Sequence, residues 1–179
     1  MESQPLVSVC MITYGHEKYV RQSIESILMQ KTDFDFELII SNDCSPDNTD
    51  QVIKDMINHH KRSKLIKYVN QEENLGMYDN FMFTINSAKS KYIAFCEGDD
   101  YWTDPMKLQK QVDFLESHPE FEVCFTNINI INDQGDVIKD QHIPSQRRSV
   151  FEHKETFLVS LQACALFSIL IRGDNLYLP

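Results

Sequence analysis

The chain has 179 residues and a formal net charge of −10 at pH 7, from 27 acidic and 17 basic side chains. This acidic excess argues against a nucleic-acid backbone or an anionic lipid surface as the main partner, because both would repel it. Its 42% hydrophobic and 11% aromatic residues exclude a disordered chain and predict one globular domain with its own core.

The N-terminus and the cysteines indicate the compartment. Residues 1–13 lack the basic and long apolar regions of a signal peptide, and no stretch reaches the roughly 18 unbroken apolar residues of a membrane span. The five cysteines are widely spaced and form no Cys-x-x-Cys pair, which predicts reduced thiols rather than a disulfide framework or a zinc site. We therefore expect a cytoplasmic protein.

Short apolar runs alternate with amphipathic segments through the first hundred residues. The expected strands cover residues 6–13, 36–41, 65–69 and 91–96, and the expected helices cover 18–30, 45–60 and 71–88. In the second helix we expect Ser45 to cap the N-terminus, with Pro46 in the first turn. The alternation predicts an α/β, Rossmann-like, mostly parallel sheet flanked by helices, which binds ligands beyond the carboxyl ends of its strands.

The second half of the chain has a less regular pattern. A helix is expected over residues 103–119, capped by Asp104 with Pro105 at its start. Beyond it we expect a strand over 121–127, a hairpin over 128–140 that turns at 133–136, a loop over 141–155, a short helix over 157–162 and a last strand over 165–172. Arg147 and Arg148 in the loop can grip a diphosphate or simply be solvated.

The stretch CEGDDYW, residues 96–102, places three carboxylates directly after a buried strand. Such carboxylates repel one another, so a cation is expected among them. Glu97 and Asp99 point to the same side if the strand end is extended, and Gly98 allows a close approach to a ligand. Mg²⁺ or Mn²⁺ is the cation that two carboxylates with substrate phosphates suit. A solvated acidic turn is the alternative, and the position after a buried strand favours the metal site.

Two further residues at strand ends allow more than one reading. Asp43 can accept hydrogen bonds from a base or a sugar, or it can cap the following helix. Tyr14 can stack on a flat ring or pack beside the first strand.

In combination these segments resemble family 2 glycosyltransferases with the GT-A fold, especially bacterial members that build surface polysaccharides. The motifs are VSVCMITYGHEKYVRQSIESILMQ, FELIISNDCSPDNT, NQEENLGMYDNF and SKYIAFCEGDDYWTDPMKLQKQVDFLE, and they cover about residues 5–125. The resemblance implies a divalent metal at the family's DxD positions, which are Glu97 and Asp99 here, with Asp99 as the main ligand.

The same resemblance implies the rest of the donor site. Tyr14 and Glu17 match the first nucleotide-contacting loop, and Asp43 matches the acid that reads the base edge. The remaining donor-binding positions that it implies are Asn74, Gly76, Asn80, Glu97, Gly98, Asp100 and Trp102.

The implied reaction is transfer of a sugar, with inversion, from a nucleotide-diphospho-sugar to a saccharide or lipid-linked acceptor. A UDP-sugar is the favoured donor, and the inner face of the membrane is a possible place of action. Two features depart from the family pattern. Glu97 replaces the first Asp, and the chain ends at LIRGDNLYLP, where the segment with the catalytic base is expected to begin. Since Asp174 comes too early for that base, we expect one GT-A domain over residues 1–179, truncated on its acceptor side, with the base absent.

Three other functions are weighed against this one. A nucleotidyltransferase would carry a phosphate loop rich in Gly and Arg or Lys near Tyr14, and none is present. A phospho-receiver domain would need Asp43 as phosphate acceptor and a late lysine, where Arg172 stands instead. A catalytically inactive nucleotide-sugar-binding module differs from a transferase only in turnover.

Overall fold

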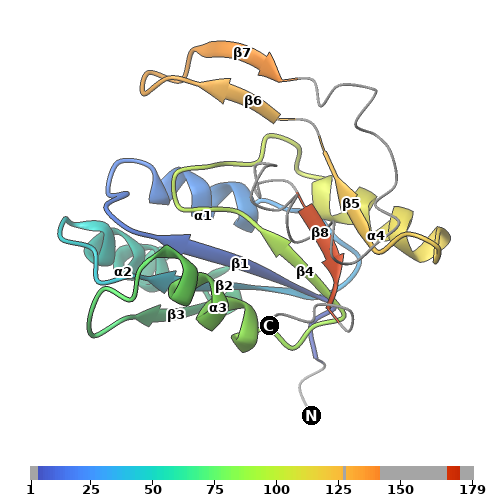
Figure 1. Cartoon of the computed structure of the whole chain (residues 1–179), viewed down its shortest axis with the longest axis horizontal. Coiled ribbons are helices and arrows are strands. Elements are labelled where there is room, and N and C mark those ends of the chain that lie inside the picture. Colours follow the sequence, from blue (N-terminus) through green and yellow to red (C-terminus); the bar gives the residue numbers. More distant parts are fainter. Residues whose placement is uncertain (1–3, 127, 142–168, 174–179) are drawn as a thin grey trace.

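The alternating pattern folds into strands and helices in the expected order (Figure 1). The structure is a computed structural model and describes residues 4–126, 128–141 and 169–173. The elements are β1 (Val7–Thr13), α1 (Val20–Leu28), β2 (Phe36–Asn42), α2 (Thr49–His59), the 3₁₀ turn η1 (Ser63–Leu65), β3 (Ile66–Asn70), α3 (Met77–Ser87), β4 (Tyr92–Phe95), α4 (Lys107–Ser117), β5 (Val123–Phe125), β6 (Ile128–Ile131), β7 (Val137–Gln141) and β8 (Ile169–Arg172). The predicted short helix and the two loop arginines lie outside the described residues, so the prediction of one domain over residues 1–179 stays a prediction.

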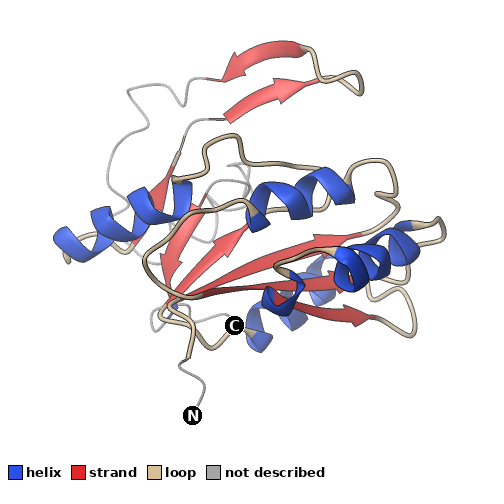
Figure 2. Cartoon of the chain, turned by 180° about the vertical axis from the view of Figure 1, so that it is seen from behind, coloured by secondary structure: helices blue, strands red, loops and turns tan. Residues whose placement is uncertain are grey.

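Six strands form one sheet in the order β3-β2-β1-β4-β8-β5. The pairs β1–β2, β1–β4 and β2–β3 are parallel, whereas β8 runs antiparallel to both β4 and β5. The prediction of a mostly parallel sheet is therefore confirmed, with one antiparallel strand from the C-terminal part inserted between β4 and β5. Figures 1 and 2, taken from opposite sides, show helices on both faces of the sheet.

Alternation along β1 divides the core between these two faces. Val7, Val9 and Met11 pack in the larger core cluster, to which α1, α2 and α4 contribute. Cys10, on the opposite face, packs in a smaller cluster with Ile85 of α3. Both faces of β1 are thus covered, which explains why its sequence VSVCMIT is mostly apolar and shows no strict alternation of apolar and polar residues.

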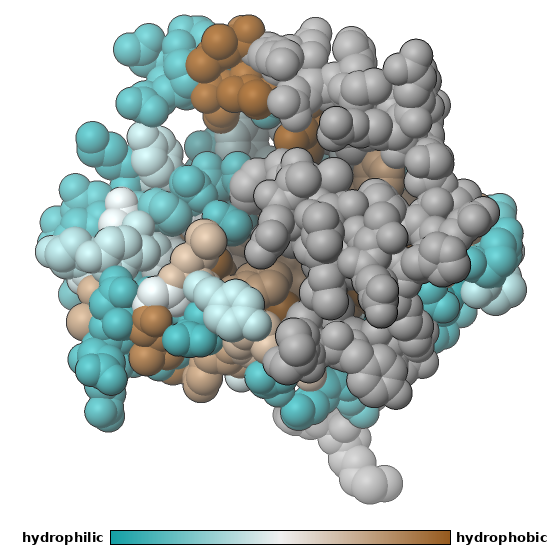
Figure 3. Space-filling model, viewed as in Figure 1, coloured by the Kyte–Doolittle hydropathy of each residue, from teal (hydrophilic) through white to brown (hydrophobic). Residues whose placement is uncertain are grey.

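Strands β6 and β7 form a separate two-stranded sheet, which stands apart from the main sheet in Figure 1. Its turn contains Gly135, whose φ of +84° glycine adopts readily, and the predicted hairpin is confirmed. Ile130, Val137 and Ile138 are 40%, 55% and 66% exposed, and Figure 3 shows apolar side chains gathered on this hairpin. No helix among the described residues is long and apolar enough to cross a membrane.

All four helices begin two to six residues later than predicted, the largest difference being at α3, and for α2 and α4 a cap was predicted as well. Helix α2 begins at Thr49, and Asp47 Oδ1 accepts a hydrogen bond of 3.0 Å from the Thr49 N–H, so the predicted cap at Ser45 is wrong. Helix α4 begins at Lys107, although Asp104 Oδ1 does accept a bond of 2.8 Å from the backbone N–H of Met106 in the preceding turn. Because α2 and α4 begin later than predicted, the segments that precede them are longer, and these segments form loops of the site.

Candidate functional site

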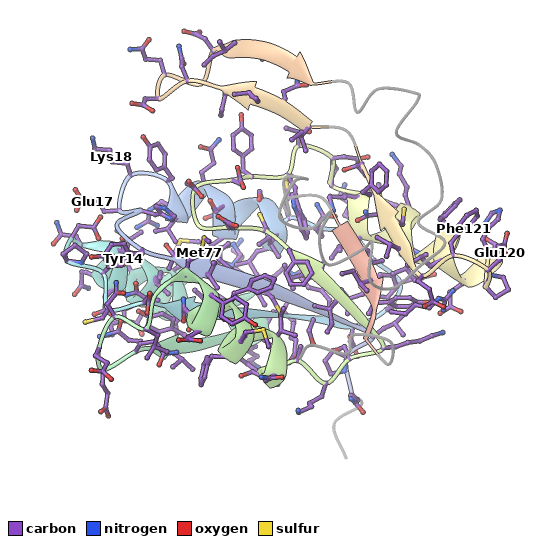
Figure 4. The ribbon with its side chains drawn as sticks, viewed as in Figure 1. Tyr14, Glu17, Lys18, Met77, Glu120 and Phe121 are labelled. Carbon is purple, nitrogen blue, oxygen red and sulfur yellow. The ribbon has the colours of Figure 1, made fainter. Side chains whose placement is uncertain are left out.

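The carboxyl ends of β1, β2 and β4 lie at one edge of the sheet. Thr13 pairs with Asn42 in the β1–β2 register, and Cys10 pairs with Phe95 in the β1–β4 register, so the loops after these strands are neighbours. Figure 4 shows Tyr14 and Glu17, from the loop after β1, at the same end of the sheet as Met77 at the start of α3. The edge expected to bind a ligand is therefore assembled from separate parts of the chain.

The loop after β1 is fixed to the loop after β2 by consecutive hydrogen bonds. The backbone N–H groups of Gly15, His16 and Glu17 donate to the side chains of Ser45, Thr49 and Asp47 over 3.0, 2.9 and 3.1 Å. Since all three donors already have partners, this loop is not a cradle of free N–H groups for a phosphate.

Tyr14 and Glu17 are placed differently within this loop. The Glu17 carboxylate, predicted to contact a nucleotide, accepts hydrogen bonds of 3.0 and 2.9 Å from the backbone and side chain of Asn48. The Tyr14 ring is 49% exposed. Tyr14 is therefore open to stack on a ligand, whereas Glu17 joins the two loops.

The structure brings Asp43, Asn74 and Gly76 together. Asp43 is 4% exposed, and its two carboxylate oxygens accept hydrogen bonds from the backbone N–H groups of Leu75 (2.7 Å) and Gly76 (3.0 Å). Asn74 adds a bond of 3.3 Å from its side-chain amide to the Asp43 carbonyl. Because both oxygens are buried and bonded, Asp43 is poorly placed to accept a phosphoryl group, and it organises the loop ahead of α3.

Asn80 is buried against the end of β2 and is 1% exposed. Its side chain accepts a hydrogen bond of 2.5 Å from the Ser41 hydroxyl and donates one of 3.2 Å to the Ser41 carbonyl. We interpret Asn80 as a link between α3 and β2 rather than a donor contact.

The acidic residues after β4 form a tight turn, Glu97–Asp100, which we call the acid turn. Strand β4 ends at Phe95, and the backbone N–H of Asp100 donates a 3.2 Å hydrogen bond to the Glu97 carbonyl. The extended strand end assumed for Glu97 and Asp99 is therefore wrong, because the chain already folds back at residues 98 and 99.

Gly98 allows a close approach within the protein rather than the predicted approach of a ligand. Its backbone N–H donates a 3.0 Å hydrogen bond to the Ile12 carbonyl. A Cβ atom at position 98 would lie 2.3 Å from Thr13 Oγ1 and 2.8 Å from His16 Nδ1. Glycine is thus required for the acid turn to pack on the end of β1.

His16 is a site residue that the sequence analysis did not single out. Its Nδ1 lies 3.1 Å from Thr13 Oγ1, and its Nε2 lies 3.7 Å from Asp99 Oδ2. The available signal was its place in the polar run TYGHE, directly after the first strand. His16 therefore links the loop after β1 to the acid turn.

The electrostatics of the acid turn favour a bound cation. Burial, and then the neighbouring charge of Asp99, raise the pKa of Glu97 to about 7. Burial, Asp99 and Glu97 raise the pKa of Asp100 to about 7 as well. Within the described residues, Asp100 Oδ2 is buried without a hydrogen-bond partner. A cation would satisfy this oxygen and relieve the repulsion between the carboxylates.

The acids are too few to enclose a metal by themselves. In the described part of the chain, no group of three or more His, Cys, Asp or Glu side chains is placed to hold one. An ion held by one or two carboxylates is the arrangement typical of Mg²⁺ when substrate phosphates and water complete its shell.

A cavity of about 1060 Å³ extends from the acid turn to hairpin β6–β7. Its lining includes Asp99, Asp100, Tyr101, Trp102 and Lys107 on one side and residues 128–133 on the other. Trp102, expected at the donor-sugar or acceptor side, is 4% exposed, and the Lys107 ammonium lies 4.2 Å from its ring centre. Burial lowers the pKa of Lys107 to about 8. The cavity joins the acids to a space large enough for a sugar.

Comparisons with known proteins agree with this architecture. The family model described as Glycosyl transferase family 2 matches residues 8–171. An uncharacterized protein of Mycobacterium tuberculosis is 38% identical over 138 residues, which are 77% of this chain and 39% of that protein. The putative teichuronic acid biosynthesis glycosyltransferase TuaG of Bacillus subtilis is 33% identical over 112 residues, 63% of this chain and 42% of TuaG. The chain thus spans less than half the length of these curated relatives.

Two solved structures share the fold. The Staphylococcus aureus protein TarS, crystallised with UDP, aligns with a TM-score of 0.69 at 20% identity, over 97% of this chain and 50% of that one. The mannosyltransferase PcManGT of Pyrobaculum calidifontis, in complex with GDP-Man and Mn²⁺, aligns with a TM-score of 0.61 at 17% identity, over 72% of this chain and 37% of that one. The sheet described above is therefore the glycosyltransferase GT-A fold.

Proposed function

This chain belongs to glycosyl transferase family 2, and we propose that it binds a nucleotide-diphospho-sugar, with a UDP-sugar as the favoured donor, at the carboxyl edge of its sheet. The observation that carries the proposal is the acid turn itself, in which Asp100 Oδ2 is buried and unpartnered within the described residues. UDP in TarS and GDP-Man in PcManGT support the ligand class.

Glu97 and Asp99 would hold Mn²⁺ or Mg²⁺, and the Asp100 carboxylate would add negative charge beside them. A bound divalent cation would supply charge neutralisation for the departing nucleoside diphosphate. His16 Nε2 lies 3.7 Å from Asp99 Oδ2, within ion-pair distance, so the imidazole would help to orient this carboxylate.

The nucleoside would lie toward the loops after β1 and β3. Tyr14 presents an exposed ring on which a base can stack, and Asp43 fixes the shape of the loop at Asn74 and Gly76. This gives Asp43 an indirect part in base recognition beside the direct contact that the family resemblance implies.

Transfer with inversion is part of the proposal. An acceptor hydroxyl would attack the anomeric carbon from the face opposite the leaving diphosphate, after losing its proton to a base. We assign that base to no described residue. The acceptor is proposed to be a saccharide or a lipid-linked saccharide, and the name of TuaG, a putative teichuronic acid biosynthesis glycosyltransferase, supports a role in polysaccharide synthesis. The cavity beside Trp102 is the proposed space for the transferred sugar and the acceptor. The cytoplasmic location stays a prediction.

Calorimetric titration tests the donor site. UDP, GDP and UDP-sugars are titrated into the wild-type chain with and without Mn²⁺, and into Asp99→Asn. We expect metal-dependent binding of a nucleotide that falls at least about tenfold in Asp99→Asn, because a ligand carboxylate is lost.

The matched control is Asp113→Asn on an exposed face of α4, which we expect to bind as the wild type does. Binding of no nucleotide by a folded wild-type sample, or equal binding by Asp99→Asn, contradicts the proposed site.

A further inference from the structure

Helix α1 has a buried polar face that contacts the segment after β4. The side chains of Ser23 and Ser26 are three residues apart, so they lie on one face of the helix, and Gln30 follows just after the C-cap residue Met29. All three are nearly inaccessible, with exposed fractions of 1%, 5% and 1%. Figures 1 and 2 show the segment between β4 and α4 running alongside α1.

The two serines bond to the backbone within the acid turn and just after it. Ser23 Oγ donates a 2.9 Å hydrogen bond to the Gly98 carbonyl, inside the acid turn. Ser26 Oγ accepts a 3.0 Å bond from the Trp102 backbone N–H and donates one of 2.7 Å to the Ser23 carbonyl. Since a hydroxyl has a single proton, these two bonds fix the direction of the Ser26 hydroxyl.

Gln30 continues this pattern toward α4. Its Nε2 donates a 2.8 Å hydrogen bond to the Asp104 carbonyl, and its Oε1 accepts one of 3.1 Å from the Leu108 N–H. Residues 98–108 are thus bonded at four backbone positions to the two serines of α1 and to Gln30, which follows the helix. Apolar side chains could occupy buried positions of this kind. Burying a polar side chain instead costs folding free energy unless all its hydrogen bonds are made.

We propose that Ser23, Ser26 and Gln30 are positioning residues that set the placement of the acid turn, and so its affinity for a divalent cation. The hydrogen bonds described above go to the backbone of the segment and not to the side chains of Glu97, Asp99 and Asp100, which stay available to the ion. His16, in the loop that leads into α1, lies with its Nε2 3.7 Å from Asp99 Oδ2. Helix α1 and its flanking residues therefore contact both the backbone and a side chain of the site. This inference rests on the proposed metal-dependent donor site.

The test compares two buried serines. Ser26→Ala removes the acceptor of the Trp102 N–H. Ser8→Ala is the matched control, because Ser8 is 0% exposed and also makes two side-chain bonds, to Glu37 (2.7 Å) and Ser90 (2.8 Å), but lies near the start of β1, away from the carboxyl edge. Mn²⁺ affinity is measured by electron paramagnetic resonance with UDP present, and stability by urea unfolding.

We expect Ser26→Ala to weaken Mn²⁺ binding about tenfold, the size typical for loss of an outer-shell partner of a metal ligand. Ser8→Ala should lose stability to a similar degree and keep its Mn²⁺ affinity. Equal affinity in wild type and Ser26→Ala, or equal weakening in both variants, overturns the inference, since either result leaves only a general packing role.

A second measurement separates this inference from the proposed function. If the wild type binds no Mn²⁺ with UDP, the proposed function fails, and hydrogen exchange then decides the positioning role. Faster exchange of the Trp102 amide, relative to the core amide of Leu38, in Ser26→Ala but not in Ser8→Ala supports it. An unchanged ratio of the two rates in Ser26→Ala overturns it.

Discussion

The buried carboxylate of Asp43 accepts a 3.0 Å hydrogen bond from the backbone N–H of Gly76, the residue that caps α3. An acid at the end of one strand thereby fixes the loop that leads into a helix 33 positions later. Its second oxygen makes an equivalent bond to Leu75.

Replacing Asp43 by Asn should therefore reduce stability. The amide keeps the shape but has one acceptor oxygen in place of two, so one backbone donor loses its partner. We expect the free energy of unfolding to fall by about 1–3 kcal/mol, measured by urea denaturation. Asp33→Asn, an exposed acid before β2, should change it little. Equal stability of the two variants would mean that the Asp43 bonds contribute nothing net.

Gly98→Ala tests the close packing of the acid turn on β1. The new Cβ would lie 2.3 Å from Thr13 Oγ1, so the turn must move away from the strand end. We expect a loss of about 1–3 kcal/mol in unfolding free energy, together with weaker Mn²⁺ binding. The comparison is Gly135→Ala in the hairpin turn, where φ is +84° and no atom lies within 4 Å of the new Cβ. This variant should lose stability through backbone strain alone and bind Mn²⁺ normally. Normal Mn²⁺ affinity in a folded Gly98→Ala protein would contradict the packing argument.

Cys44 has a φ of +55°, the single non-glycine residue with positive φ among those described. Side chains disfavour this region, whereas glycine accepts it. Cys44→Gly should raise the unfolding free energy by about 1 kcal/mol relative to Cys44→Ala. Comparison with alanine isolates the backbone effect, because both variants lose the thiol. Both unfolding free energies are measured by urea denaturation, and equal values for Cys44→Gly and Cys44→Ala would show that the loop relaxes this strain.

The acid turn makes stability depend on pH. Glu97 and Asp100 have pKa values of about 7 in the folded chain, above their ordinary values of 4.5 and 3.8, so the folded state binds their protons more tightly. The resulting stabilisation is present at about pH 4 and is lost as the pH rises to about 7. At pH 8 the unfolding free energy of Asp100→Asn, measured by urea denaturation, should therefore exceed that of the wild type by about 1–2 kcal/mol. At pH 4 the two unfolding free energies should be nearly equal.

These titrations are made without divalent metal, with Asp113→Asn as the control. Adding Mn²⁺ at pH 8 should stabilise the wild type more than Asp100→Asn, because the ion compensates the same repulsion. If the unfolding free energy of Asp100→Asn depended on pH as strongly as that of the wild type, the Asp100 carboxyl would not have the raised pKa that its burial and neighbouring charges predict.

Sequence patterns alone were enough to predict the order of elements, the parallel core of the sheet and the polar edge that carries Tyr14, Asp43 and the acid turn. These follow from local periodicity and from the rule that parallel strands end together, so a single sequence contains them. The family motifs likewise lie within continuous stretches of the chain.

The partners of the polar side chains became visible only in the folded chain. Ser23 and Ser26 bond to residues 75 and 76 positions away, and nothing in the neighbouring sequence specifies those partners. Asn80 matched a family position and proved to be buried against Ser41. The antiparallel β8 enters between β4 and β5 because pairing is chosen by the packing of the whole sheet. Periodicity records which face of an element is covered, whereas hydrogen-bond partners depend on segments that meet only when the chain has folded.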